Sequence, residues 1–348
     1  MDSAQAGRDG SRTRTAPGMK ILFITSNRLG DAVLSTGLLD HLIRRHPGAR
    51  ITIACGPVAV PLFAEAPGIE RVIALTKKPY SGHWLDLWRQ TAFRVWDRVV
   101  DLRASGFVWT VLAKDRCRLV KNDAPVHRLR LLADVLGLED IVSPKVWTAE
   151  EHHAAAADLI PPGPVLGIGP TANWGGKQWP AESFVDLIRR LRAPGQPFED
   201  APVAVFGGPG ERGAAGPVLE SLAEESRIDL VGKAGLLTVA ACLERCALYI
   251  GNDSGLMHLA AAAGAPTLGL FGPSREVHYA PFGAKAAFVR TPESYEQILY
   301  TPGYDFRSQQ CLMGSLEVDT VVEAAQELLA RLGGAIASPP APASANAP

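Results

Sequence analysis

The sequence predicts an α/β fold made of two successive units with largely parallel sheets. Apolar runs of strand length alternate with helical patterns along the chain, as they do in proteins with parallel sheets. The Pro-Pro-Gly-Pro stretch inside residues 150–164 separates two such series and suits a link between domains. A chain of 348 residues is long enough to give each unit its own core. Because both units begin with a strand and a glycine-containing loop, we expect a ligand-binding cleft between their C-terminal strand edges.

The first unit is expected to cover residues 19–155, after a polar, Gly-, Arg- and Ser-rich tail at 1–18 that we expect to be disordered. The predicted strands of this unit are residues 20–25, 50–54, 71–75 and 98–101. Its predicted helices are residues 31–45, an amphipathic stretch within 77–94, and 126–136, which Gly137 closes.

The second unit is expected to cover residues 156–332, followed by an Ala-, Pro- and Ser-rich tail at 333–348 that we also expect to be disordered. Its predicted strands are residues 165–168, 203–206, 229–231, 247–250 and 267–271. Its predicted helices are residues 181–191, a helix containing Leu219 and Leu222, a Leu- and Ala-rich helix after residue 255, and 316–332. The last helix could pack on its own unit or back on the first.

Charge is distributed unevenly between the two units. The formal net charge is only −1, but residues 19–150 hold 19 Lys and Arg against 13 Asp and Glu, whereas residues 151–348 hold 13 against 21. A basic first unit favours an anionic partner there, with ordinary solvated surface charge as the alternative. No nucleic-acid partner is expected.

The five cysteines form no CxxC pair, so we do not expect them to bind a metal. We expect reduced thiols, as in a cytoplasmic protein. No apolar stretch reaches the length of a membrane span, and residues 1–18 lack the apolar region of a signal peptide. We therefore expect a cytoplasmic protein that could still touch a membrane face.

The stretch GNDSGLMHLAAAAGAPTLGLFGP, residues 251–273, is the most informative part of the chain. It follows an apolar run and places a polar turn, a helix and a second apolar run in succession. The free N–H groups at the start of this helix would point toward Asp253, Ser254 and His258, which suits an anionic ligand. The alternative is structural, because Asp253 and Ser254 are also ordinary N-cap residues and a helical histidine is often simply packed.

Two further loops carry candidate groups. Residues 25–31, TSNRLGD, match neither a dinucleotide-binding fingerprint nor a Walker loop. Asp31 there is either a helix N-cap or a carboxylate that removes a proton from a hydroxyl nucleophile. Residues 169–177 offer Lys177 for a pyrophosphate, and Glu211 could bind ribose hydroxyls, although both residue types are common on solvated surfaces.

Three segments together resemble glycosyltransferase family 9, which contains the ADP-heptose:lipopolysaccharide heptosyltransferases. They are ILFITSNRLGDAVLSTGLLDHL, GPTANWGGKQWPAESFVDLIRRL and LYIGNDSGLMHLAAAAGAPTLGLFGPS, and the likeness runs from about Met19 to Leu332. The resemblance implies a GT-B fold, with two Rossmann-like domains facing each other across a cleft. It also implies an inverting transferase that needs neither a metal nor another cofactor.

The resemblance also implies roles for individual residues. Asp31 would be the general base on the acceptor hydroxyl. The donor, a nucleotide-diphosphate sugar with ADP-heptose as the family default, would bind the second domain. The donor-binding residues implied are Thr171, Asn173, Lys177, Glu211, Asp253, Ser254, Gly255 and His258.

The acceptor side departs from the family pattern. Many members carry a basic residue where this chain has Thr25, and Arg28 lies nearby. The acceptor implied is an anionic, lipid-linked glycan such as a lipopolysaccharide core, at the inner face of the inner membrane. Arg28, Lys77, Lys78 and Arg89 are the predicted acceptor-binding residues. The competing hypotheses are a sugar-nucleotide epimerase of similar shape and a non-catalytic nucleotide-sugar-binding protein.

Overall fold

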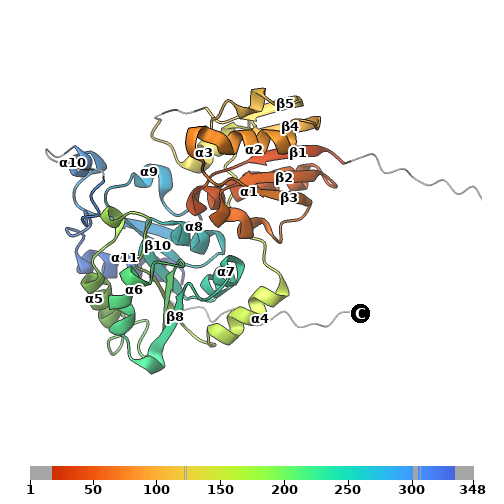
Figure 1. Ribbon diagram of the computed structural model, residues 1–348. Helices are drawn as coiled ribbons and strands as arrows, with labels where there is room; N and C mark the ends of the chain where they lie inside the picture. The colour runs from red at the N-terminus through yellow and green to blue at the C-terminus, as the bar shows by residue number, and fades with distance from the viewer. Residues whose placement is uncertain (1–17, 121, 123, 301–304, 306, 334–348) are drawn as a thin grey trace, which may run out of the picture.

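The computed structural model describes residues 18–120, 122, 124–300, 305 and 307–333. The tails predicted at 1–18 and 333–348 therefore lie outside the described residues, except for Gly18 and Gly333. The chain forms two lobes, the first coloured red to yellow and the second green to blue (Figure 1). Each lobe contains one parallel sheet with helices on its faces.

The first sheet has five parallel strands in the order β3-β2-β1-β4-β5. The strands are β1 (Lys20–Ile24), β2 (Arg50–Cys55), β3 (Ile69–Ala74), β4 (Trp96–Asp101) and β5 (Ala113–Arg118). The helices of this lobe are α1 (Leu29–Arg45), α2 (Gly82–Thr91) and α3 (Arg128–Asp134), with 3-10 turns η1 (Pro57–Phe63), η2 (Pro79–Ser81) and η3 (Phe107–Trp109). The strand order reverses between β1 and β4, which makes that edge the expected binding crevice of this sheet.

The second sheet has six parallel strands in the order β11-β10-β9-β6-β7-β8, and its order reverses between β9 and β6. The strands are β6 (Leu166–Gly169), β7 (Val203–Gly207), β8 (Arg227–Val231), β9 (Leu248–Asn252), β10 (Thr267–Phe271) and β11 (Ala286–Arg290). The helices are α4 (Glu150–Leu159), α5 (Ala181–Leu191), α6 (Arg212–Glu220), α7 (Leu236–Glu244), α8 (Gly255–Ala262), α9 (Glu276–Tyr279), α10 (Tyr295–Leu299) and α11 (Val318–Arg331), with 3-10 turns η4 (Gly175–Lys177) and η5 (Glu224–Ser226).

The two lobes are joined by direct helix packing. Helix α1 of the first lobe packs against α8 of the second, and these helices lie where the lobes meet in Figure 1. The approach requires two glycines without side chains. A Cβ on Gly30 would lie 2.8 Å from His258 Cδ2, and one on Gly255 would lie 2.9 Å from Leu29 Cβ. The starts of the two helices are therefore held together, with Asp31 and His258 close to the contact.

The final helix belongs to the second lobe. Its buried residues Val321, Ala325 and Leu328 join the core beneath the second sheet, and the helix packs on α5 and β11. The expectation that it could return to the first domain is thus corrected. Helix α4, inside the predicted linker, likewise packs on α7 of the second lobe.

None of the helices in the described part of the chain combines the length and the apolar character that crossing a bilayer requires. All five cysteines are unpaired. Burial raises the pKa of Cys55 and of Cys242 to about 12, so both thiols are protonated at neutral pH.

Candidate functional site

Lys177 and Asp253 form the centre of the site in the second lobe. Lys177 ends η4 after β6, and Asp253 directly follows β9, the neighbouring strand at the point where the order of the sheet reverses. Lys177 Nζ donates to Asp253 Oδ2 at 2.5 Å, and only 6% of the Asp253 side chain is exposed, against 24% for Lys177. The two residues, predicted separately as donor contacts, thus form one largely buried ion pair.

His258 links this pair to the first lobe. It is the fourth residue of α8, is buried, and places Nε2 3.9 Å from Asp253 Oδ1. Burial lowers the pKa of His258, Asp253 and Asp31 oppose this, and Lys177 adds to the lowering. The imidazole is therefore neutral at neutral pH. His258 therefore lies between the two lobes, against Gly30, which directly precedes Asp31, on one side and near the Lys177–Asp253 pair on the other.

Asp31 is the third residue of α1 and not its N-cap, which is Arg28. The capping alternative for Asp31 is therefore wrong. Its carboxylate accepts one long hydrogen bond, from Ser26 Oγ to Oδ2 at 3.3 Å. This half-exposed carboxylate in the first turn of the helix therefore keeps acceptor positions open for a ligand.

Glu211 and Thr171 form a second polar group on the donor side. Glu211 Oε2 accepts hydrogen bonds from Thr171 Oγ1 and from the Gly208 N–H, both at 2.7 Å. Thr171 is buried, so its hydroxyl orients Glu211 and is not open to a large ligand. Asn173 is exposed and does not join either group, so its predicted contact stays a prediction.

The start of α8 supplies the remaining donor-side groups. Ser254 is the N-cap of this helix but makes no side-chain cap hydrogen bond, and its buried Oγ has only the Tyr249 phenol as a polar neighbour among the described residues. Gly255 opens the helix, so its N–H is one of the groups that have no partner inside the helix. The turn thus offers unpaired polar groups beside the Lys177–Asp253 pair.

The predicted acceptor cations are only partly available. Lys78 Nζ lies 2.6 Å from Asp86, and Arg89 Nη1 lies 4.0 Å from the other oxygen of Asp86. Lys77 is exposed. Arg28 is exposed at the mouth of the site, directly before α1.

Thr25 does not face the site. It is fully buried, and its Oγ1 lies 2.8 Å from Ser35 Oγ within the first lobe. Thr25 therefore cannot contact a ligand in place of the basic residue that the family resemblance predicts at this position.

Sequence reasoning missed a clasp between the lobes, formed by two histidines. His127 Nε2 donates to the Ala280 carbonyl at 2.9 Å, and His278 Nδ1 donates to the Val126 carbonyl at 2.8 Å. Tyr279 lies between these contacts, with its ring centroid 6.4 Å from that of His258. Burial raises the pKa of the Tyr279 phenol, and Asp31 and Asp253 add to the rise. The clasp therefore places a tyrosine near His258, where both carboxylates affect its pKa.

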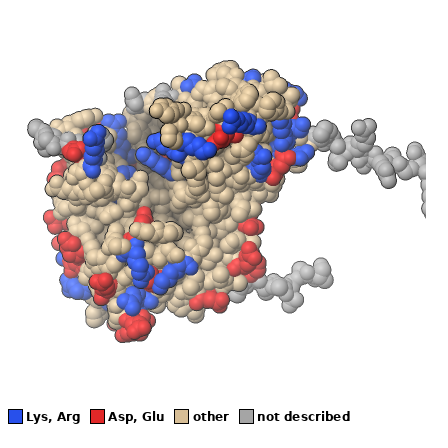
Figure 2. All heavy atoms as spheres, in the orientation of Figure 1, with Lys and Arg blue, Asp and Glu red and all other residues tan. Residues whose placement is uncertain are grey.

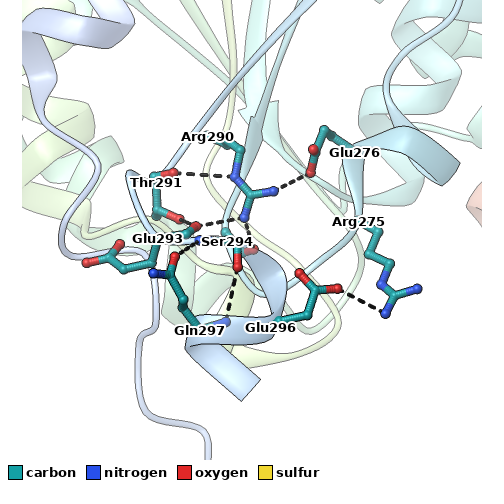
Figure 3. A network of polar contacts seen from close by, with 9 residues as sticks. Arg275, Glu276, Arg290, Thr291, Glu293, Ser294, Glu296 and Gln297 are labelled. Atoms are coloured by element: carbon teal, nitrogen blue, oxygen red, sulfur yellow. Dashed lines mark hydrogen bonds and ion pairs between the residues drawn. The ribbon is translucent and has the colours of Figure 1, made fainter. Parts of the chain in front are cut away.

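A polar network fixes the base of this clasp (Figure 3). Arg290 at the end of β11 binds the Glu276 carboxylate at the start of α9, and also donates to the Glu293 carbonyl at 2.8 Å. Arg275 pairs with Glu296 at 3.1 Å. These contacts tie α9 to β11 and α10, while His278 and the Ala280 carbonyl bind the first lobe. The ion pairs Arg290–Glu276 and Arg275–Glu296 join residues 14 and 21 positions apart, so no helical or strand periodicity in the sequence predicts them.

The clasp should weaken in acid. His127 Nδ1 also accepts from the Leu129 N–H at 3.2 Å, so its bonds require the neutral ring. Burial lowers the pKa of His127 from its ordinary 6.5, so the folded state binds protons less readily than the unfolded state, and stability falls as pH drops below about 6.5. In His127→Asn the amide keeps one donor and one acceptor but does not titrate. We expect the Tm of this variant to fall by about 2 °C less between pH 8 and pH 5.5 than the Tm of the parent protein. Scanning calorimetry measures this, and equal losses in both proteins would contradict it.

Comparison with known proteins identifies the family. The sequence profile described as glycosyltransferase family 9 (heptosyltransferase) matches residues 111–299, which is more than half of the chain. The chain belongs to glycosyltransferase family 9. This family 9 enzyme is a glycosyltransferase, as the three segments quoted above predict.

Its curated relatives are heptosyltransferases. Lipooligosaccharide heptosyltransferase 2 of Haemophilus influenzae is 26% identical over 322 residues, covering 79% of this chain and 89% of the relative. Lipopolysaccharide heptosyltransferase 2 of Salmonella typhimurium is 26% identical over 319 residues, covering 80% and 90%. The likeness thus spans both lobes of the family 9 enzyme.

Solved structures confirm the fold. The family 9 glycosyltransferase of Veillonella parvula has a TM-score of 0.72 at 24% identity, covering 90% of this chain and 97% of that one. The ADP-heptose heptosyltransferase II of E. coli has a TM-score of 0.68 at 21% identity, covering 90% and 99%. E. coli heptosyltransferase WaaC, solved with ADP, has a TM-score of 0.64 at 17% identity, covering 89% and 100%. The predicted two-sheet GT-B architecture is confirmed.

Proposed function

We propose that this family 9 enzyme transfers a sugar, with inversion, from a nucleotide-diphosphate sugar to a hydroxyl of an anionic, lipid-linked glycan acceptor. The family default is transfer of heptose from ADP-heptose to a lipopolysaccharide core. The observation that carries the proposal is the place of His258, which lies against Gly30, next to Asp31 in the first lobe, and 3.9 Å from Asp253, the partner of Lys177 in the second. A carboxylate facing a diphosphate-binding cation across a domain interface is what such a transfer requires.

The donor would lie on the second lobe. Lys177, held in place by Asp253, and the free N–H groups at the start of α8 would stabilise the charge that develops on the leaving diphosphate. Glu211 uses Oε2 for its protein contacts, so Oε1 is left for a ribose hydroxyl. The relative WaaC has been solved with ADP and with ADP-2-deoxy-2-fluoro heptose, which supports an ADP-linked donor here.

The chemistry would be a single displacement. The acceptor oxygen forms a bond to the anomeric carbon while the bond from that carbon to the diphosphate oxygen breaks on the opposite face. Asp31 takes the proton of the acceptor hydroxyl, a contribution typically worth about 10²–10⁴-fold in rate. The packing of α1 on α8 excludes water from the space behind these groups, which disfavours hydrolysis of the donor.

The acceptor would approach along the first lobe. Lys and Arg side chains gather on this lobe along the upper edge of the hollow between the lobes (Figure 2). This distribution agrees with the excess of basic residues over residues 19–150 and suits an anionic acceptor at the inner face of the inner membrane.

Mass spectrometry of the purified protein, incubated with a panel of nucleotide sugars with and without lipid-core acceptors, tests the proposal. We expect a glycosylated acceptor and a free nucleoside diphosphate in equal amounts, only when both substrates are present. Conversion of the donor alone to an isomer would indicate an epimerase. Binding of a donor without turnover in any combination would indicate a non-catalytic protein.

Transfer should not depend on a divalent cation, because Lys177 and the start of α8 already supply positive charge for the diphosphate. We expect the initial rate to be the same in EDTA as in buffer containing Mg²⁺. A rate abolished by EDTA and restored by Mg²⁺ or Mn²⁺ would show that the diphosphate is held by a metal.

A further inference from the structure

Arg103 lies at the C-terminal edge of the first sheet, beyond the strand next to the one that leads to Asp31. Asp101, the last residue of β4, is in register with Ile24, the last residue of β1, and the Leu102 N–H donates to the Ile24 carbonyl at 2.9 Å. The chains that continue from these neighbouring strands lead to Arg103 and to Asp31. The order of the first sheet reverses between these strands, and ligands of α/β sheets bind at such a point.

The Arg103 guanidinium is held on an aromatic surface. Its Cζ lies 4.7 Å from the centroid of the Trp84 ring, and Trp84 in turn stacks on Phe107 with centroids 5.5 Å apart. This contact occupies the face of the guanidinium and leaves its edge free to donate hydrogen bonds. Nη1 is buried, and no hydrogen-bond partner for it is found among the described residues. A buried charged donor without an acceptor is costly, so the arrangement calls for an added oxygen ligand.

The nearest acidic residue does not supply that oxygen. Asp101 Oδ1 accepts from the Arg103 N–H at 2.8 Å, and Oδ2 accepts from the N–H and the hydroxyl of Ser105 at 2.9 and 2.5 Å. Both carboxylate oxygens therefore hold the backbone of the loop. Ala104 in this loop has φ 53°, a left-handed conformation that costs free energy for a residue with a Cβ. The loop is thus held in a strained form that fixes where the Arg103 side chain begins.

The surroundings of Arg103 include His83, Lys77 and the buried carboxylate of Asp101. Burial lowers the pKa of the neighbouring His83, and Arg103 and Lys77 lower it further. The His83 ring lies 5.2 Å from Trp84 and lines a cavity of about 420 Å³ beside α2. Lys78 and Arg89 line the same cavity but are paired with Asp86, whereas no ion pair of Arg103 is found among the described residues.

We propose that Arg103 is a binding residue for an oxyanion of the acceptor, a carboxylate or a phosphate near the reacting hydroxyl, which accepts from Nη1. The planar guanidinium matches the paired oxygens of both groups. This inference rests on the proposed transferase function for the identity of the ligand. The oxyanion site itself rests only on the geometry of Arg103, Trp84 and Asp101.

The first experiment tests the oxyanion site without turnover. The intact protein is modified with phenylglyoxal while inorganic phosphate or acetate is titrated, and peptide mass spectrometry follows Arg103 and Arg71, an exposed arginine on β3 of the same lobe. We expect one or both anions to slow modification of Arg103 and to leave Arg71 unchanged. Stronger protection by phosphate favours a phosphate group on the acceptor, and stronger protection by acetate favours a carboxylate. Modification of Arg103 at an unchanged rate in both anions would overturn the proposal.

The second experiment tests the acceptor as the source of the anion. Arg103→Ala should raise the acceptor KM by about 10- to 100-fold, the worth of a charged hydrogen bond, while kcat and the Kd for ADP stay the same. Arg103→Lys keeps the charge but loses the planar fork, so its acceptor KM should lie between those of Arg103→Ala and the parent protein. The acceptor KM of Arg71→Ala should match that of the parent protein. If the parent protein is active and Arg103→Ala leaves the acceptor KM unchanged, the proposed role of Arg103 is rejected and the proposed function is not. An absence of transfer by the parent protein would reject the proposed function and leave the phenylglyoxal result standing.

Discussion

Asp31→Asn is expected to lower kcat by about 10²–10⁴-fold, because the amide has nearly the shape of the carboxylate but cannot take the acceptor proton. The change should leave the fold intact, since Asp31 accepts only one long hydrogen bond, from Ser26. ADP affinity should be unaffected, because the groups proposed to bind the diphosphate come from the second lobe. Initial rates at saturating donor and calorimetric titration with ADP measure both quantities.

Asp40→Asn is the matched control for Asp31. Asp40 lies on the same helix, nine residues further along, and pairs with Arg44 and Lys145 at the surface of the first lobe. Its substitution removes a carboxylate of α1 without touching the proposed site, so transfer should continue at the parent rate. Full activity of Asp31→Asn would mean that another group, or water, removes the acceptor proton.

Lys177→Ala is expected to weaken ADP binding by about 10- to 100-fold, the effect of losing a charge-assisted hydrogen bond to a phosphate. It should also lower the free energy of unfolding, because the buried Asp253 carboxylate, only 6% exposed, would lose the cation 2.5 Å away. Isothermal calorimetry with ADP measures the first effect, and denaturant titration the second.

A double variant separates these two effects. In Lys177→Ala with Asp253→Asn the unpaired buried charge is gone, so much of the lost stability should return while ADP binding stays weak. Lys114→Ala is the control for a lost cation, because Lys114 pairs with Asp97 at 2.7 Å in the first lobe, away from the donor. Unchanged ADP affinity in Lys177→Ala would show that Lys177 serves only to neutralise Asp253.

The sequence predicts the buried strands better than the edge strands. The central strands β1 and β9 contain the apolar runs 21–24 and 248–250, because a strand covered on both faces is largely apolar. The missed strands, β5 and β11, both lie at a sheet edge. β5 reads AKDRCR and is only partly buried, so it has neither an apolar run nor a clear alternation. Its place comes from pairing with β4, which no local pattern encodes.

The residues of the candidate site also differ in how far the sequence predicts their roles. Asp31, Lys177 and Asp253 could be selected from the sequence because each follows a predicted strand, where parallel sheets gather functional side chains. Arg103 also follows a predicted strand, and that position was the available signal, yet nothing in the sequence shows that Asp101 is already occupied by its own loop. Whether a side chain still has a free hydrogen-bonding position depends on its neighbours in space.

By itself, the sequence determined the α/β alternation, the loops that carry the polar groups and the membership of family 9, because these depend on residues close together in the chain. Only the tertiary structure decided that Lys177 pairs with Asp253, that the last helix stays on the second lobe, and that His127 and His278 clasp the lobes. The partners in the three hydrogen-bonded contacts are separated by 76, 153 and 152 residues. Packing of whole sheets and helices brings such residues together, and it leaves no periodic signal along the chain.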